Sequence, residues 1–324
     1  MQKLVVLILL VFMIVSCNEG KNDSQKLLSD SSGNINNLSV VVDNDLWESS
    51  VGESLRGVFA APVYGLNQDE PLFILSQIPP SVFSGFATKS RIVLKIEKGN
   101  EGNIKIAKNV FAKPQKVIVI SGKTDDEIIE QIENNSQRMI TSLKNEEIKE
   151  RQRRTKLALH KNNNIKEKLG ITIEFPSAYR IAKEDNNFYW IRKDITTGTT
   201  NLLLYELPYG TINEKDSMSV TSQIIKIRDS VGQIYIPGPI DGSYMATENA
   251  YTPFIAKTTI DDKLTYETKG LWDVKNAFMS GPCVNYVIED RENLDLNNDA
   301  DFLDTLLINF NENQKFPIIK RISE

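Results

Sequence analysis

The first seventeen residues constrain the location in which the chain folds more than any other stretch does. Lys3 supplies a positive start, residues 4–15 are almost unbroken apolar, and Ser16 places a small side chain directly before Cys17. A dozen apolar residues are too few to cross about 30 Å of hydrocarbon as a stable helix, but they match the core of a signal peptide. The pattern predicts a lipoprotein signal in residues 1–17, cleaved before an acylated Cys17.

Lipidation of Cys17, with palmitate or a similar acyl chain, would hold the mature chain at a membrane surface without a spanning helix, because two or more acyl chains give stable anchoring. The alternative is a retained anchor with an incidental cysteine, which needs a longer apolar run. Residues 18–37 are rich in Asn, Ser, Lys and Gly. Such composition predicts a flexible tether, which at about 20 residues has an r.m.s. reach of about 25 Å.

The composition of the chain limits the number of domains and the classes of partner that it can have. The chain has 324 residues, of which 40% are hydrophobic and 25% charged, as expected for one large or two modest folded domains. A net charge of −5 disfavours nucleic acid and anionic lipid head groups as partners. With Cys17 acylated, Cys283 has no disulfide partner and is expected to be a small buried hydrophobe.

The chain has one histidine, His160. No Ser-His-Asp triad can therefore form elsewhere, and no multi-histidine metal site can be assembled. We expect neither a metal nor another cofactor, and we expect His160 to occupy a solvated helix end, where an imidazolium favours the helix dipole.

Residues 38–123 predict an N-terminal α+β domain. Apolar and β-branched runs predict strands at 38–42, 71–78, 91–96 and 116–120, with 103–107 as a hairpin partner and a helix over 50–60. Gly122-Lys123-Thr124 is not a phosphate loop, because Val117 stands where such a loop needs its first glycine. Thr124 is instead expected to cap the next helix.

Residues 124–164 predict one long connecting helix. Thr124 and Glu127 have the spacing of a capping box, and apolar residues follow at helical spacing. Helical to Leu159, this segment would measure about 50 Å and could bridge two domains. The arginines 151, 153 and 154 suit a solvated helix end, and the alternative is a site for phosphate or for a partner's acidic patch.

Residues 165–324 predict a C-terminal α+β domain. Strands are expected at 171–176, 188–192, 201–206, 254–259, 263–268, 283–288 and 304–310, a helix from Val220 to Gly232, and a short helix over 317–323. The predicted fold class is α+β, with two mainly antiparallel sheet-plus-helix halves joined by the long helix.

Several short segments, together with the signal, resemble an uncharacterised Bacteroidota lipoprotein family that is described as a domain of unknown function. The segments are residues 41–47, 70–73, 242–245, 269–272 and 279–282. The resemblance runs from about Leu38 to the end, implies an envelope lipoprotein and carries over no catalytic residue. Residues 169–324 are also similar, at the level of the fold, to the Mog1/PsbP-like α/β/α sandwich, through residues 175–179.

Two shorter signals concern the envelope. Asp216-Ser217-Met218 has the form of a Bacteroidota O-glycosylation triplet and makes Ser217 a glycosylation candidate, although so loose a triplet also arises by chance. Residues 18–21 mix charges and lack an acidic surface-export pattern. This favours the periplasmic face of the outer membrane over the cell surface.

The candidate ligand-binding residues are Tyr244, Glu248, Glu267 and Trp272. Aromatic side chains beside carboxylates suit a carbohydrate or peptide pocket, but Trp and Tyr at strand ends also commonly complete the edge of a core. We expect no catalytic residues and a non-enzymatic binding or scaffold protein for an outer-membrane assembly. Its expected partners are the membrane, through the lipid, and an envelope protein. The alternative is a glycan hydrolase that uses Glu248 and Glu267 as paired carboxylates.

Overall fold

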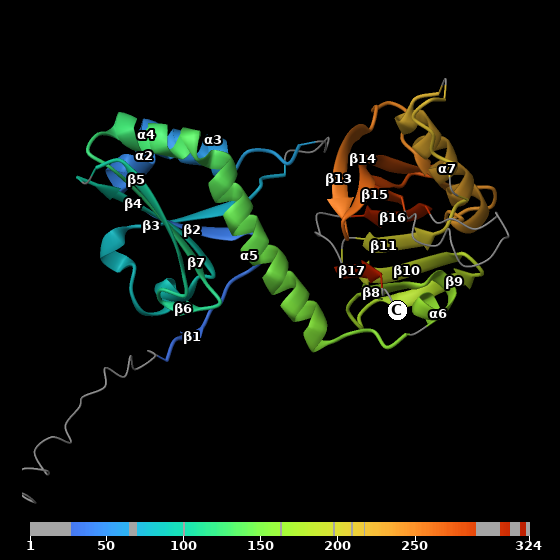
Figure 1. Cartoon of the computed structure of the whole chain (residues 1–324), viewed down its shortest axis with the longest axis horizontal. Helices are drawn as coiled ribbons and strands as arrows, with labels where there is room; N and C mark the ends of the chain where they lie inside the picture. The colour runs from blue at the N-terminus through green and yellow to red at the C-terminus, as the bar shows by residue number, and fades with distance from the viewer. Residues whose placement is uncertain are drawn as a thin grey trace, which may run out of the picture.

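The chain forms two sheet-containing domains joined by a long helix (Figure 1). The computed structural model describes residues 27–64, 70–99, 101–162, 164–196, 198–208, 210–216, 218–289, 305–311 and 318–321. The α+β class predicted from the sequence is confirmed. Cys17 and Ser217 lie outside the described residues.

The N-terminal sheet has the strand order β3-β2-β4-β7-β5. Neighbours among β2, β3, β4 and β7 run parallel, and only β5 pairs antiparallel, with β7. The expected antiparallel arrangement is therefore wrong for this half, because helices lie between β2 and β3 and provide the crossover that parallel pairing requires. The strands are β2 (Asn37–Val41), β3 (Ile74–Ile78), β4 (Ile92–Lys98), β5 (Asn103–Lys108) and β7 (Lys116–Gly122).

Side-chain alternation along these strands builds two apolar faces. Val40, Leu94 and Ile118 belong to the main core, which also holds apolar residues of the helices on that face. Val41, Val93 and Val117 point to the other face, where Phe83 packs against them. The helices of the main core are α2 (Asn44–Glu48), α3 (Ser50–Phe59), α4 (Asp125–Asn134) and the first turns of α5, and two short 3₁₀ helices, η1 (Pro80–Val82) and η2 (Gly85–Lys89), flank Phe83.

The predicted connecting helix is present but divided. Thr124 caps α4 as expected, since its hydroxyl accepts a hydrogen bond from the Glu127 amide at 3.2 Å. The helix breaks at Asn135, and α5 runs over Ser136–Leu157. Its 22 residues correspond to about 33 Å, and it leads from the N-terminal domain to the C-terminal one (Figure 1).

His160 does not occupy a solvated helix end. It lies beyond α5, and its ring stacks on Phe175 with centroids 4.8 Å apart. The His160 amide donates to the Phe175 carbonyl at 2.9 Å. The expectation is wrong because α5 ends at Leu157, and the chain then turns to pair with the start of the C-terminal domain.

The C-terminal domain is built on one antiparallel sheet with the order β12-β14-β15-β16-β11-β10-β9, and β13 also pairs with the long β14. The hairpin of β13 and β14 and the strands at 188, 201, 283 and 304 confirm the sequence predictions, whereas β9 and β12 were missed. The strands are β9 (Arg180–Asp185), β10 (Phe188–Ile195), β11 (Gly198–Tyr205), β12 (Tyr244–Thr247), β13 (Phe254–Ile260), β14 (Lys263–Lys275), β15 (Ser280–Glu289) and β16 (Thr305–Asn311).

Different elements pack on the two faces of this sheet. Helix α7 (Val220–Tyr235) packs on one face around Ile224, and it continues past Gly232, where the sequence predicted its end. Helix α6 (Asn164–Leu169) and strand β8 (Ile171–Glu174) cover the other face. The helix expected over 317–323 is wrong, because Ile318–Arg321 form β17, which pairs with β8.

Part of the predicted tether is fixed to the N-terminal domain. Strand β1 (Ser29–Asp30) pairs parallel with β6 (Ala112–Lys113), and the Arg91 guanidinium donates to the carbonyls of Gly33 and Asn34. The described residues of the tether from Ser29 onward therefore follow the domain surface. None of the helices in the described part of the chain has the length and hydrophobicity needed to cross a membrane.

Candidate ligand pocket in the C-terminal domain

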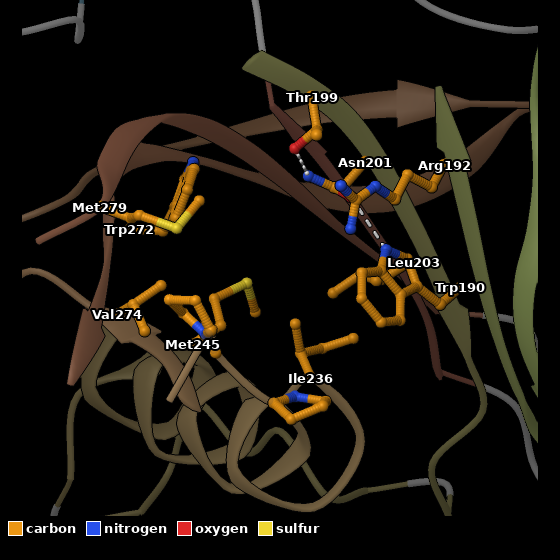
Figure 2. A pocket seen from close by; sticks show the side chains of 13 residues that line it. Trp190, Arg192, Thr199, Asn201, Leu203, Ile236, Met245, Trp272, Val274 and Met279 are labelled. Atoms are coloured by element: carbon orange, nitrogen blue, oxygen red, sulfur yellow. Dashed lines mark hydrogen bonds between the residues drawn. The ribbon is translucent and has the colours of Figure 1, made fainter. Parts of the chain in front are cut away.

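A pocket of about 250 Å³ lies on the α7 side of the C-terminal sheet. In Figure 2, Trp272, Val274 and Met279 stand on one side of it and Trp190, Arg192 and Asn201 on the other. Its lining is mainly apolar, with a few polar groups, which is the composition typical of small-molecule and side-chain pockets. The lining residues are Trp190, Arg192, Thr199, Asn201, Leu203, Ile236, Pro237, Gly238, Pro239, Met245, Trp272, Val274 and Met279.

Strand alternation delivers these side chains to one face. Trp190 and Arg192 are two residues apart on β10, and they pair in register with Leu203 and Asn201 of β11. Towards the other end of the strand order, Val274 of β14 pairs with Met245 of β12 on the same face. Alternate residues of a strand share a face. The pair β10–β11 therefore forms one wall of the pocket, and the pair β12–β14 forms the other.

The β10–β11 wall carries an ordered row of polar groups. Trp190 Nε1 donates to Asn201 Oδ1 at 2.9 Å, and Asn201 Nδ2 donates to Thr199 Oγ1 at 3.0 Å. The Arg192 guanidinium carbon lies 5.9 Å from the Trp190 ring centroid, and Arg192 Nε donates to Asp194 at 3.0 Å. Asp194 offsets the charge of Arg192, so this wall presents a fixed polar surface without a free cation.

The opposite wall holds a hydrogen-bond donor that is not satisfied. Trp272 is 9% exposed, and its Nε1 is buried without a hydrogen-bond partner among the described residues. A buried donor left unpaired costs about 1–3 kcal/mol. Because the nitrogen itself is closed off from solvent, the part of Trp272 that the pocket presents is the apolar surface of its ring.

The end of α7 and the loop after it close the pocket. Met245 N donates to the Ile236 carbonyl at 3.1 Å, and Gly238 N donates to the Ser243 carbonyl at 2.8 Å. A Cβ at Gly238 would lie 2.3 Å from Ser243 Oγ and 2.5 Å from a Val274 methyl. Only glycine therefore allows this loop to approach the sheet so closely.

A second, more open hollow of about 620 Å³ adjoins the pocket. The two share Thr199, Trp272 and Met279, so Trp272 forms part of both walls. In the second hollow, Asp273 Oδ2 pairs with Lys275 at 2.8 Å, while its Oδ1 is buried and unpartnered within the described structure. Phe278, which also lines this hollow, is fully exposed.

The structure separates the four predicted binding residues. Trp272 lines both hollows, Glu248 lines only the second, and Tyr244 and Glu267 line neither. Glu267 lies five residues before Trp272 on β14, within an uninterrupted register, so the two side chains point to opposite faces. Glu267 instead accepts a hydrogen bond from Tyr286 Oη at 2.7 Å and pairs with Lys269 at 2.8 Å.

Sequence reasoning missed the β10–β11 wall. Trp190 and Arg192, and Thr199, Asn201 and Leu203, each recur at a spacing of two, which is the available signal. The alternation shows that such residues share a face, but it does not show that the face lies opposite Trp272.

Reactive groups are absent from the described part of the pocket. The pocket walls contain no cysteine, histidine or carboxylate. Within the described ranges no three His, Cys, Asp or Glu side chains are placed to hold a metal ion. Cys283 is buried as expected, and burial raises the pKa of its thiol, which disfavours the nucleophilic thiolate.

Two family models match the chain, on either side of the end of α5. Domain of unknown function (DUF8532) matches residues 31–156, and Domain of unknown function (DUF4837) matches residues 158–297. No curated protein matches the chain. The predicted resemblance to proteins described as a domain of unknown function is confirmed, and the first match includes almost all of α5. The chain is therefore similar to DUF8532 in its first part and to DUF4837 in its second, and the candidate pocket lies within the second match.

Proposed function

We propose that the protein is a non-enzymatic binding or scaffold lipoprotein, anchored through Cys17 to the periplasmic face of the outer membrane. Its C-terminal pocket would hold an apolar side chain of an envelope protein partner. The observation that carries the proposal is the composition of the pocket, in which Trp190, Trp272, Met245 and Met279 surround the space without a reactive group.

The adjoining hollow supports a protein partner over a small free ligand. Because Thr199, Trp272 and Met279 belong to both hollows, an extended segment could place one side chain in the pocket and continue across the second hollow. Exposed Phe278 and Met279 would then be covered, and exposed apolar groups of this kind often mark interaction sites.

The test is site-specific photocrosslinking in cells. A photoreactive amino acid at Met279 is expected to give one reproducible crosslinked product with a single partner. The same group at Ile234, an exposed position of α7, should give none. Thr199→Trp, which fills the space between the two hollows, should abolish the Met279 crosslink. Thr258→Trp, on an exposed part of β13, is the matched control and should leave it intact. Equal crosslinking in both tryptophan variants would contradict the pocket as the binding site.

The hydrolase alternative predicts a different result. Glu248 and Glu267 do not line a common hollow, and Glu267 is held by Tyr286 and Lys269. We expect Glu267→Gln to preserve function, because the amide oxygen can still accept from Tyr286. Loss of a glycan-cleaving activity in this variant, with the fold intact, would favour the hydrolase.

The anchor has its own test. Cys17→Ala removes the sulfur that would carry the acyl chain, so the chain should leave the membrane fraction. Continued retention of this variant in washed membranes would contradict lipid anchoring.

A further inference from the structure

Two loops of the N-terminal domain expose apolar side chains. Val82 and Phe86, in the segment of η1 and η2, are 59% and 77% exposed. Val110 and Phe111, between β5 and β6, are 39% and 38% exposed. Exposed phenylalanines grouped in this way mark an interaction surface more often than single scattered ones do. We call these four residues and Phe83 the aromatic loop surface.

The two loops are fixed to each other. Phe83 and Phe111 meet edge to face, with ring centroids 5.5 Å apart. Gln115, which is 1% exposed, joins the loops from below: its Oε1 accepts from the Phe111 amide at 2.8 Å, and its Nε2 donates to the carbonyls of Thr88 and Ser90, each at 2.8 Å. The exposed rings therefore stand on a preorganised base.

The start of the described chain runs between the same two loops. Ser31 N donates to the Lys113 carbonyl at 3.1 Å, and Ser32 N donates to the Lys89 carbonyl at 2.8 Å. Strand β1 thus lies beside β6, at an end of the N-terminal domain remote from α7 (Figure 1). Cys17 precedes Ser29 by twelve residues, and a chain of that length spans at most about 43 Å even when fully extended. A lipid on Cys17 would keep this surface close to the bilayer.

The surroundings of the surface are basic, although the whole chain carries a net charge of −5. The sequence has no carboxylate between Glu70 and Glu97, or between Glu101 and Asp125. These stretches include Lys89, Lys108 and Lys113, and none of the three forms an ion pair with a described residue; Asp30 of β1 is the one carboxylate brought near by register.

We infer that the aromatic loop surface lies on the bilayer that holds the lipid anchor. Phe86 and Phe111 would enter the boundary between head groups and acyl chains, while Lys89, Lys108 and Lys113 meet lipid phosphates. Aromatic rings beside lysines are the composition of interfacial membrane contacts, and tethering raises the effective concentration of the second contact. The inference rests on the lipid anchor of the proposed function, and it orients the molecule with the N-terminal domain against the membrane.

The test uses the full-length lipidated chain in vesicles of phosphatidylethanolamine and phosphatidylglycerol. Phe86→Cys and Val110→Cys carry an environment-sensitive fluorophore, and Phe278→Cys, on the exposed turn of the C-terminal domain, is the matched control. Buried Cys283 does not compete for the label. We expect the emission at positions 86 and 110 to shift to shorter wavelength and to be quenched by brominated lipid, with no change at position 278.

A charge variant separates the lysines from the rings. Each lysine near an anionic surface contributes about fivefold to binding. Replacing Lys89, Lys108 and Lys113 by Gln should therefore lower the equilibrium constant for docking about a hundredfold. Lys156, Lys161 and Lys166, exposed lysines beyond the N-terminal sheet, provide the control triple and should have no effect.

The outcomes distinguish the two proposals. Chain that floats with vesicles but keeps the 86 and 110 probes in water overturns docking and leaves the anchor standing. Labelling of the parent chain at Cys17, with loss of flotation, overturns the anchor and docking together. Probe shifts that need added envelope protein, or that rise with protein concentration without lipid, assign the surface to a protein contact and overturn the bilayer contact.

Discussion

Arg91 and Glu147 form a buried two-point ion pair that fastens helix α5 to the N-terminal sheet. Arg91 Nε and Nη2 donate to the two Glu147 carboxylate oxygens at 2.7 and 2.9 Å, and both side chains are 1% exposed. Glu147 also accepts from the Asn36 amide, and Arg91 donates to the carbonyls of Gly33 and Asn34. One pair thus joins the sheet, the interdomain helix and the segment that leads from the N-terminus.

Removal of one partner of this pair should destabilise the N-terminal domain strongly. Glu147→Gln leaves the Arg91 charge buried without a counter-ion, at a cost of about 3–5 kcal/mol, measurable by urea unfolding. Arg91→Met combined with Glu147→Leu removes both charges and should recover most of that loss. A double variant as unstable as Glu147→Gln would show that the pair itself, rather than the orphaned charge, controls stability.

Glu150 should make stability depend on pH in the acid range. Burial acts to raise the pKa of this carboxyl, but hydrogen bonds from Arg153 and Arg154, both at 2.7 Å, outweigh it and lower the pKa from 4.5 to about 2. The folded state therefore binds this proton less tightly than the unfolded state. Its stabilisation is complete above pH 4.5 and is lost as the pH falls towards 2.

Comparison with Glu150→Gln isolates this contribution. Because Arg153 and Arg154 are half exposed, solvent screening limits it to on the order of 1 kcal/mol. The unfolding free energies of the two proteins should differ by a constant amount from pH 5 to 7 and converge between pH 4.5 and 2. A difference that persists at pH 2 would contradict a titrating Glu150.

Trp272→Phe should separate binding from stability. The indole Nε1 has no partner among the described residues, so its loss removes no internal hydrogen bond and should change the unfolding free energy by less than about 1.5 kcal/mol. The same change removes part of the apolar ring surface that a bound side chain would contact, worth about 1 kcal/mol or roughly fivefold in affinity. The measurement is the yield of the Met279 crosslink as a function of partner concentration, and unchanged affinity would exclude the Trp272 ring as a contact.

Gly232→Ala should displace the end of α7 and with it the closure of the pocket. A Cβ at this position would lie 2.0 Å from the Met245 carbonyl oxygen, so helix and strand must separate, at a cost of about 1–3 kcal/mol. Gly57→Ala is the control, because Gly57 lies in α3 with nothing within 4 Å of its Cβ position. It should stabilise the chain by about 0.5–1 kcal/mol. Thermal unfolding of both variants checks the opposite signs.

Local patterns predicted most elements of the fold. Thr124 caps its helix as its spacing with Glu127 indicated, and β-branched runs became strands β2, β4 and β7. The helix expected over 317–323 became β17, because pairing with β8 supplied hydrogen bonds that local propensity does not register. Of the predicted binding residues, Trp272 reached the pocket, whereas Glu267 points to the opposite face.

The sequence by itself determined the α+β class and the cap at Thr124, because each depends on neighbours along the chain. It also predicted the burial of Cys283, which is confirmed, and a lipid anchor at Cys17, which stays a prediction. Tertiary structure alone decided the parallel order of the first sheet, the pairing of Arg91 with Glu147, and the pocket between Trp190 and Trp272. Alternation fixes which residues of a strand share a face, but not which strands become neighbours. Those contacts depend on strand order and register, which are set by the packing of the whole domain.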